Sequence, residues 1–432
     1  MRMKLSRLSD VFWFLPMALG IGALLLAQGL IFLDRALNDA DLGVWGALFY
    51  RVGASGSRDI LGAIGGSMLA VAATSFSITV SVLATASSTY GPRLVRNFMN
   101  DRGNQFVLGI FGATFLYSLM VLRSIQDATI DNGSFVPDIA VNVAVLLAVV
   151  DVAVLVYFIN HIARSIQVST LSARVRSELV AVVDTLYPEE QPDNSRPAVP
   201  PRTDSAPIVS TESGFVLSVD ENALLRAAES ADCLVEVLVR PGDHIVEGEE
   251  LVCVHPPERV ADVTEAVCKA VEFGITRTPY RDIQFAVQQL VEMAVRALSP
   301  GTNDPYTAHN AFNELATGLV PMARRPAPRL GRVDSGQTVR LIVTRLPLTE
   351  LIDDVFDAVR IYALDAPVAM TSAIMLARRI GIAAVDTDVR ESVLRHLALI
   401  DAAEAASTAD RVNVDFCRGE IDVARQAILS AS

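Results

Sequence analysis

One carboxylate lies deep inside an apolar run of the sequence. The stretch from Val136 to about Asn160 contains Asp138 near its start and Asp151 well inside it. Because a carboxylate in hydrocarbon is costly, we expect Asp151 to face a bundle interior or water rather than lipid. Asp151 could be a proton or cation site, or one buried carboxylic acid bonded to a neighbouring Ser, Thr or Tyr. Asp138 lies near the outer end, where it could simply reach water.

A row of hydroxyl side chains occupies another apolar run, from Ile60 to about Ser88. Their spacings of 3, 4, 4 and 3 residues place them on one face of a helix. The residues are Thr74, Ser77, Ser81, Thr85 and Ser88. Such a face could line a water-filled path in an oligomer. It could instead be a tight helix interface, which the small residues Gly62, Gly65 and Gly66 favour.

A third candidate is the polar segment SPGTNDPYTA, residues 299–308. It has a full structural explanation as a corner between two helices, with Asn303 or Asp304 capping the second helix and Pro305 at its first position. Its polar groups could also bind a small anion or small-molecule ligand, or contact a partner subunit. The residues of that hypothesis are Arg296, Ser299, Asn303, Asp304, Thr307 and His309. Glu292 and Arg296 could be only a surface ion pair, since they are four residues apart.

Basic residues lie between the second and third apolar runs. Arg93, Arg96 and Arg102 can act as a topology signal and contact anionic lipid. The alternative is that this segment couples the membrane part of the chain to its soluble part.

The sequence contains no recognisable catalytic set. None of the four cysteines stands at CxxC spacing, which argues against a zinc or redox motif. His161 lies at the inner end of the fourth apolar run, where an interfacial position explains it, and three other histidines (His244, His255 and His396) are isolated. There is no phosphate-binding loop or dinucleotide fingerprint. We therefore expect no metal and no cofactor, and enzymatic activity is the least favoured function.

Four apolar runs are long enough to cross a bilayer. They are Val11–Leu33, Ile60 to about Ser88, Phe106–Leu122 and Val136 to about Asn160. A hydrocarbon core of roughly 30 Å needs about 20 residues at about 1.5 Å per residue. A signal peptide is the alternative for the first run because basic residues precede it. The run is longer than an ordinary signal sequence of about 7–15 apolar residues, and no clear cleavage site follows.

Charge is unevenly distributed along the chain. Residues 1–165 carry 11 basic and 10 acidic side chains, whereas residues 166–432 carry 25 and 39. The acidic second part argues against nucleic acid as a partner. Arginine and lysine concentrate before the first run, between the second and third, and after the fourth. This pattern predicts a multi-pass protein of the bacterial inner membrane with both termini in the cytoplasm.

The cytoplasmic part is predicted to be α+β. We expect a helical extension and a Pro-rich linker over residues 166–210, a small β domain over 211–256, and an α+β domain over 257–432. Within the last of these, residues 258–320 look helical. The spacing of Pro241-Gly242-Asp243 and Gly248 resembles the biotinyl/lipoyl type of barrel-sandwich domain. No lysine lies between Gly214 and Pro256, so this region cannot carry biotin or lipoate on a lysine.

Three stretches together resemble a family of predicted bacterial inner-membrane proteins of unknown function. They are residues 87–105, residues 108–117 and residues 297–308. The resemblance covers most of the chain and implies an architecture of four N-terminal spans, without implying an activity. Thr302 stands where the family pattern leads us to expect a β-branched aliphatic residue.

Two functional hypotheses follow. The first is an oligomeric ion channel or transport-like protein, with the second and fourth spans near the conducting path and a cytoplasmic part that regulates or assembles it. Four spans make a thin bundle, so a pore would need several subunits around an axis. The second is a membrane-anchored binding or scaffold module without conduction, in which the segment near Asn303 binds a partner.

Overall fold

The computed structural model describes residues 13–37, 53–90, 101–126, 135–165, 167–197 and 204–431. The chain divides into two compact units, residues 1–167 and residues 168–432. We refer to them as the membrane unit and the C-terminal unit, and each is described by itself.

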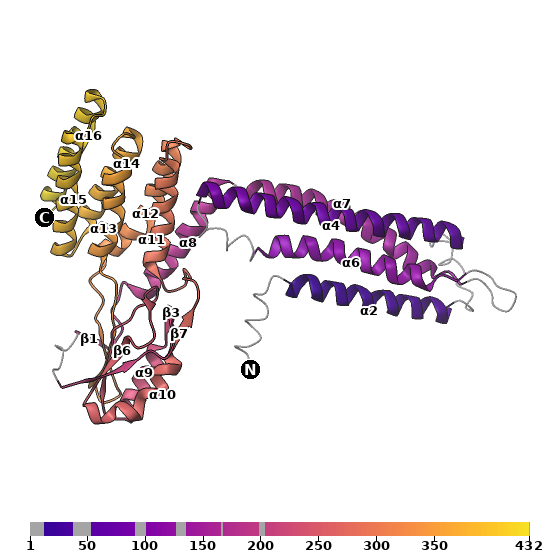
Figure 1. Ribbon diagram of the computed structural model, residues 1–432, viewed down its shortest axis with the longest axis horizontal. Helices are drawn as coiled ribbons and strands as arrows, with labels where there is room; N and C mark the ends of the chain where they lie inside the picture. The colour runs from indigo at the N-terminus through magenta and orange to yellow at the C-terminus, as the bar shows by residue number, and fades with distance from the viewer. Residues whose placement is uncertain are drawn as a thin grey trace. The chain divides into compact units, whose positions relative to one another are not determined.

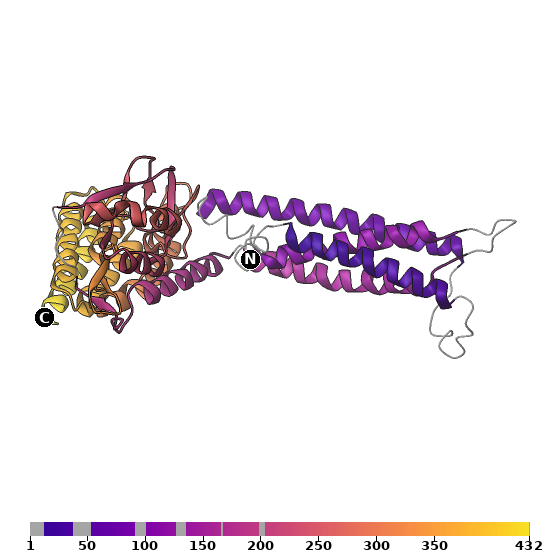
Figure 2. The same cartoon turned by 90° about the horizontal axis from the view of Figure 1, so that it is seen from below.

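The membrane unit is built from four long apolar helices that lie side by side (Figures 1 and 2). They are α2 (Phe14–Leu37), α4 (Ala54–Tyr90), α6 (Arg102–Ser124) and α7 (Asp138–Ser165). Each has the length and composition to cross a membrane. The helices are longer than most of the apolar runs because polar residues extend them; α6, for example, begins after Asp101, whose side chain accepts a hydrogen bond from Gly103 N.

Helix α6 packs against all three other spans, while α2 and α4 have little contact with each other. The approach of α2 to α6 depends on a glycine. A Cβ atom at Gly109 would lie 2.7 Å from Leu19 Cδ1 and 3.0 Å from the backbone of Pro16. Small residues of this kind allow close packing of helices in lipid.

The C-terminal unit combines a helical half with a β half (Figure 1). Its helices are α8 (Val168–Leu186), α9 (Glu221–Ser230), α10 (Val260–Ala270), α11 (Ile283–Ala297), α12 (Pro305–Arg324), α13 (Leu348–Tyr362), α14 (Pro367–Ala383), α15 (Thr387–Ala406) and α16 (Arg411–Ser430), with a short 3-10 turn at Pro257–Arg259. Helix α12 packs against α8, α11 and α14, whereas α9 and α10 lie on the β half.

The strands form two sheets. The six-stranded sheet has the order β1-β8-β9-β4-β6-β2, and the three-stranded sheet has the order β5-β3-β7. The strands are β1 (Ser195–Arg196), β2 (Ala206–Val209), β3 (Gly214–Val219), β4 (Leu234–Val237), β5 (His244–Ile245), β6 (Glu250–His255), β7 (Val271–Gly274), β8 (Gly331–Val333) and β9 (Val339–Ile342). Strands β4 and β9 pair in parallel, and all the other paired strands are antiparallel.

The β half differs from the barrel-sandwich expected from the turn spacing. Over the described residues the strands form two open sheets rather than a closed barrel, so that prediction is not confirmed. Strands outside residues 211–256 complete both sheets: β1 and β2 come from the expected linker region, and β7, β8 and β9 from the region after residue 256. The prediction that residues 258–320 are helical throughout is wrong at β7, whose Val271 and Phe273 pair with β3.

A buried ion pair fixes the start of α11. Asp282 is only 3% exposed and receives hydrogen bonds from Arg277 Nε at 2.6 Å, Arg277 Nη2 at 2.7 Å and Phe285 N at 2.9 Å. It therefore caps the helix and neutralises an arginine at the same time.

Candidate functional site

Asp151 lies on the buried face of α7, in the middle of the fourth span. Its side chain is 1% exposed, and it is the fourteenth residue of a span that runs from Asp138 to Arg164. Ala144 and Phe158, seven residues to either side, share this buried face. The carboxyl group is thus held inside the bundle, away from lipid, as the sequence predicted.

The buried side of the membrane unit contains polar groups that are not paired, and Asp151 is one of them. Neither carboxylate oxygen has a hydrogen-bond partner among the described residues. The hydroxyl group of the buried Thr114 lies close by on α6, outside hydrogen-bond geometry. The Ser118 hydroxyl and both amide atoms of Asn104, also on the buried face of α6, are without partners in the described part of the chain. Most buried polar groups in folded proteins are hydrogen-bonded, so this interior is unusual.

Two apolar clusters flank Asp151 along the bundle. The Phe158 cluster contains Val107, Phe111, Phe158 and Ile162. The Tyr117 cluster contains Ala27, Ile31, Leu61, Tyr117, Val121, Ile125, Ala140, Val141 and Ala144. On α7 and on α6, Asp151 and Thr114 fall in the interval between the two clusters. The carboxyl group is therefore closed off by apolar side chains toward both ends of the bundle.

Polar contacts connect both ends of α7 to α2 and α6. At its N-terminus, the Asp34 carboxylate of α2 accepts hydrogen bonds from Ile139 N at 3.1 Å and Ala140 N at 3.0 Å, and Tyr117 Oη donates to Ala140 O at 2.9 Å. A carboxylate at this position also complements the helix dipole. Near the other end, His161 Nε2 lies 3.0 Å from Asp101 Oδ2.

The sequence did not predict these contacts because their partners are 23 to 106 residues apart. The interfacial explanation of His161 is therefore incomplete, since its ring pairs with Asp101 and stacks on Tyr157. The only sequence signal was that Asp34 borders the first apolar run.

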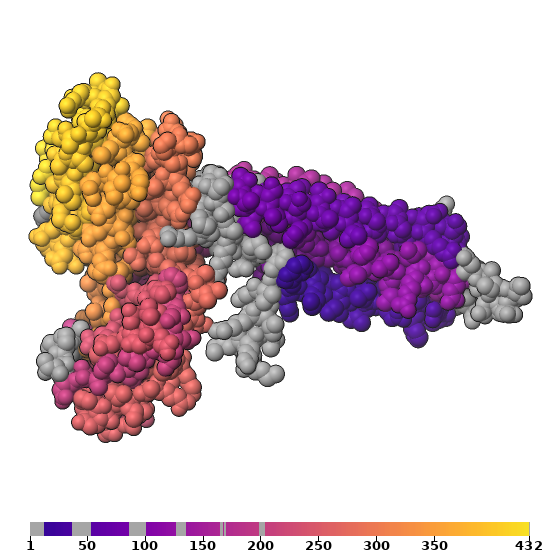
Figure 3. Space-filling view, viewed as in Figure 1, coloured from indigo at the N-terminus to yellow at the C-terminus, as the bar shows by residue number. Residues whose placement is uncertain are grey.

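The hydroxyl row of α4 lies on a different surface from Asp151. Thr74, Ser77, Ser81 and Thr85 are all exposed, and the Oγ1 atoms of the two threonines bond backbone carbonyls of their own helix. The α4 residues that turn inward are others, including Ser75 and Thr79. Figure 3 shows α4 along the surface of the membrane unit. Within one chain, the structure does not bring the row and Asp151 together, and the Ser88 side chain lies outside the described residues.

The segment 299–308 forms the helix corner that its sequence indicates. Asp304 caps α12 through Thr307 N at 3.0 Å, and the Thr307 hydroxyl, which donates to Asp304 Oδ2 at 2.6 Å, lowers the pKa of that carboxyl group below its usual value despite partial burial. Asn303 takes a positive φ of 46°, which asparagine tolerates better than most residues. Ser299 Oγ donates to Arg296 O at 2.7 Å. The ligand role of this segment remains a prediction.

His309 extends the corner into the helical half. Its Nδ1 lies 2.6 Å from Ser372 Oγ, and its Nε2 lies 2.9 Å from Asn313 Nδ2. Ser372 Oγ is also placed to donate to Val368 O at 2.8 Å. These contacts fit a neutral imidazole with the proton on Nδ1, donated to Ser372 Oγ. Arg296 pairs with Glu292 at 3.0 Å, as their spacing suggested.

The remaining sequence hypotheses can be placed only in part. Arg102 is the first residue of α6, while Arg93 and Arg96 lie outside the described residues. Within the described ranges, no group of three or more His, Cys, Asp or Glu side chains could hold a metal ion.

A four-helix membrane unit followed by a mixed α and β unit defines an integral membrane protein. Residues 9–378 match the model of the family of predicted membrane proteins DUF2254, and the chain belongs to that family. It is 31% identical over 368 residues to uncharacterised proteins of Mycobacterium bovis and of Mycobacterium tuberculosis, covering 83% of this chain and 70% of each relative. No solved structure matches the chain.

Proposed function

We propose that this protein is an oligomeric channel or transport-like protein of the bacterial inner membrane, in which Asp151 is the proton or cation site. The observation that carries this proposal is a carboxyl group without hydrogen-bond partners among the described residues, at the middle of the fourth span. A charged carboxylate without a partner is costly in such a setting, so this group gains most from a proton, a cation or water.

The two apolar clusters favour a gated site over a permanently open pore. Phe111 and Phe158 close the Asp101 side, and Tyr117 and Val121 close the Asp34 side. In this proposal, an ion reaches Asp151 when one cluster opens and the other remains packed. Such separate opening of two barriers around a fixed site is the basis of alternating access in transporters.

The exposed face of α4 supplies the subunit interface in this proposal. Besides its hydroxyls, the face carries Gly62 and Gly66, and a Cβ atom at either glycine would meet nothing within 4 Å. Small residues gain little from lipid but let a second helix approach closely. Copies of α4 would then meet around an axis, with the cytoplasm holding both termini and the C-terminal unit.

Reconstitution of the full chain in liposomes tests the role of Asp151. We expect proton or monovalent cation flux under an imposed gradient, and a loss of about tenfold or more in Asp151→Asn, since the substitution removes the ionisable group. Asp138→Asn is the matched control, because Asp138 begins the same helix and is only half-buried. Absence of flux in the wild type under any gradient, or equal flux in the two variants, would refute the proposal.

A pair of glycine substitutions tests the interface. Gly66→Leu should dissociate the oligomer in detergent, measured by native mass spectrometry, because leucine fills the face on which a second α4 packs. Gly22→Leu introduces the same side chain at an open position of α2 and should leave the oligomer intact. An unchanged oligomer in both variants would exclude this face of α4 as the interface.

The second candidate function, a membrane-anchored binding or scaffold module, is favoured by one specific feature of the C-terminal unit. The corner near Asn303 places a residue of positive φ and several polar groups at the surface between α11 and α12. If the protein is such a module, Asp151→Asn leaves its function in cells unchanged, whereas Asn303→Ala abolishes that function.

A further inference from the structure

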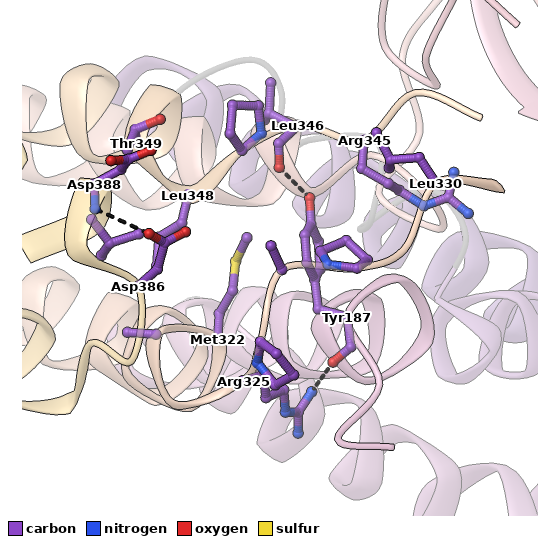
Figure 4. A pocket seen from close by; sticks show the side chains of 16 residues that line it. Tyr187, Met322, Arg325, Leu330, Arg345, Leu346, Leu348, Thr349, Asp386 and Asp388 are labelled. Carbon is purple, nitrogen blue, oxygen red and sulfur yellow. Dashed lines mark hydrogen bonds between the residues drawn. The ribbon is translucent and has the colours of Figure 1, made fainter. Parts of the chain in front are cut away.

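The C-terminal unit contains a cavity of about 210 Å³ that lies apart from all the candidate sites above. Its walls come from the residue after α8, the end of α12, the loop before β8, the β9–α13 connection and the start of α15. Figure 4 shows these elements around a central Met322. The cavity therefore joins segments that are spread over about three quarters of the unit's sequence.

Most of the wall is apolar. Met322, Leu346, Leu348 and Val389 are buried side chains that line it, and three prolines contribute to the rim and walls. An apolar cavity of about 150 Å³ can hold a benzene molecule. This cavity is larger, so it accommodates a single ring that carries a short substituent.

The polar groups at one end of the cavity are acidic. Asp386 and Asp388 stand at the start of α15, next to the Thr349 side chain (Figure 4). Asp386 Oδ1 accepts a hydrogen bond from Asp388 N at 3.0 Å, which caps the helix. Among the described residues, no arginine, lysine or histidine forms an ion pair with either carboxylate. This end thus carries two carboxylates without an ion-pair partner among the described residues.

The basic residues of the cavity are already neutralised. Arg325 donates to Asp184 Oδ1 at 2.7 Å and to Tyr187 O at 2.8 Å. Arg345 pairs with Glu221, and its guanidinium group lies on the far side of Tyr187 from Asp386 (Figure 4). The Tyr187 hydroxyl is also committed, because it donates to Leu346 O. The charge that remains available to a ligand is therefore negative.

We propose that this cavity binds a small organic amine, with its apolar body against Met322, Leu346 and Leu348 and its ammonium group at Asp386 and Asp388. The apolar walls supply affinity through burial of the ring, and the carboxylates select the cation. No sequence pattern indicates this site, since its residues share no motif and are brought together only by the fold.

Calorimetric titration of the full chain in detergent with 2-phenylethylamine tests the proposal. We expect saturable binding with a Kd of about 1 mM or below, and binding of the neutral 2-phenylethanol at least about fivefold weaker, as loss of a partly exposed ion pair predicts. The anion phenylacetate should not bind. Failure of the amine to bind, or stronger binding of phenylacetate, would overturn the proposal.

Two variants locate the binding at this cavity. Asp386→Asn should weaken the binding of 2-phenylethylamine by about fivefold. It should keep α15 capped, since asparagine also caps helices. Asp410→Asn is the control, because Asp410 caps α16 through the same type of hydrogen bond, to Val412 N at 2.8 Å. Ala327→Phe places a ring at the exposed rim, where folding is not at risk, and should block the cavity. Unchanged affinity in both Asp386→Asn and Ala327→Phe would contradict the assignment.

Discussion

Two aspartates, one in each unit, are almost equally buried and differ in what surrounds them. Asp282 of the C-terminal unit is 3% exposed, and Asp151 of the membrane unit is 1% exposed. Asp282 receives three hydrogen bonds, two of them from an arginine that neutralises it. Asp151 has no hydrogen-bond partner among the described residues.

The comparison shows that burial alone does not identify a functional carboxylate. Asp282 has a structural role, because a helix N-terminus and an arginine bind its two oxygens. It has no free oxygen with which to bind a ligand. A carboxylate such as Asp151 contributes no bond to the fold, so its retention within apolar surroundings calls for another explanation. The two should respond in opposite ways to substitution.

The largest effect is expected for Asp282→Ala. Removing one partner of a buried ion pair leaves Arg277 uncompensated, which costs about 3–5 kcal/mol of unfolding free energy. Urea denaturation followed by circular dichroism, with hydrogen exchange of α11, measures it. Asp357→Ala, which breaks the exposed pair with Arg360, should change stability by less than about 1 kcal/mol. Equal effects would mean that the buried pair is not a structural element.

A smaller effect is expected at the helix corner. Asp304→Ala removes the cap of α12 and should cost about 1 kcal/mol, whereas Asp304→Asn should cost only a few tenths because asparagine caps as well. Urea denaturation of the two variants checks this. If Asp304→Asn abolished a cellular function while leaving stability intact, the corner would be a binding site rather than only a cap.

The local parts of the fold followed from the sequence. The apolar runs predicted all four spans. The capping residues of the segment 299–308 predicted the start of α12, and the helical extension expected from residue 166 contains α8. Each of these depends on neighbours within a few residues, which is why periodicity and capping were sufficient.

The remainder depends on contacts between distant residues. The parallel pairing of β4 with β9 joins Val235 to Leu341, and no local pattern specifies such a pair. Likewise, no local pattern specifies the hydrogen bond between Asp34 and Ala140 or the cavity next to Asp386. For the candidate site, the sequence predicted that Asp151 faces a bundle interior or water rather than lipid, but not that the hydroxyl row of α4 turns outward.

Glu404 of α15 is a third buried carboxyl group, and its ionisation predicts that the stability of the C-terminal unit depends on pH. It is 1% exposed, and burial, reinforced by the nearby Asp365, raises the pKa of its carboxyl group above the ordinary value of 4.5. The folded state then holds the proton more tightly than the unfolded state. This group therefore lowers stability as pH rises from its pKa in the unfolded state to its pKa in the folded state.

Glu404→Gln should therefore stabilise the C-terminal unit at neutral and alkaline pH, and the gain should vanish as pH falls toward the ordinary carboxyl value. Thermal unfolding across a pH series measures the difference. Glu391→Gln, an exposed position on the same helix, is the control. A gain independent of pH would show that packing, rather than ionisation, distinguishes the variant.

The smallest effect on stability is expected for Asp151→Asn. Because neither Asp151 oxygen meets hydrogen-bond geometry among the described residues, a neutral side chain of the same shape changes at most the contact with Thr114, and the thermal unfolding temperature of the membrane unit should not fall. Asp34→Asn is the matched control in the same unit, since it loses one of two hydrogen bonds that cap α7 and should be less stable. If the two variants were destabilised alike, Asp151 would have to be a structural group with partners inside the bundle. If Asp151→Asn keeps its stability and loses flux, the carboxyl group is needed for conduction and is dispensable for folding.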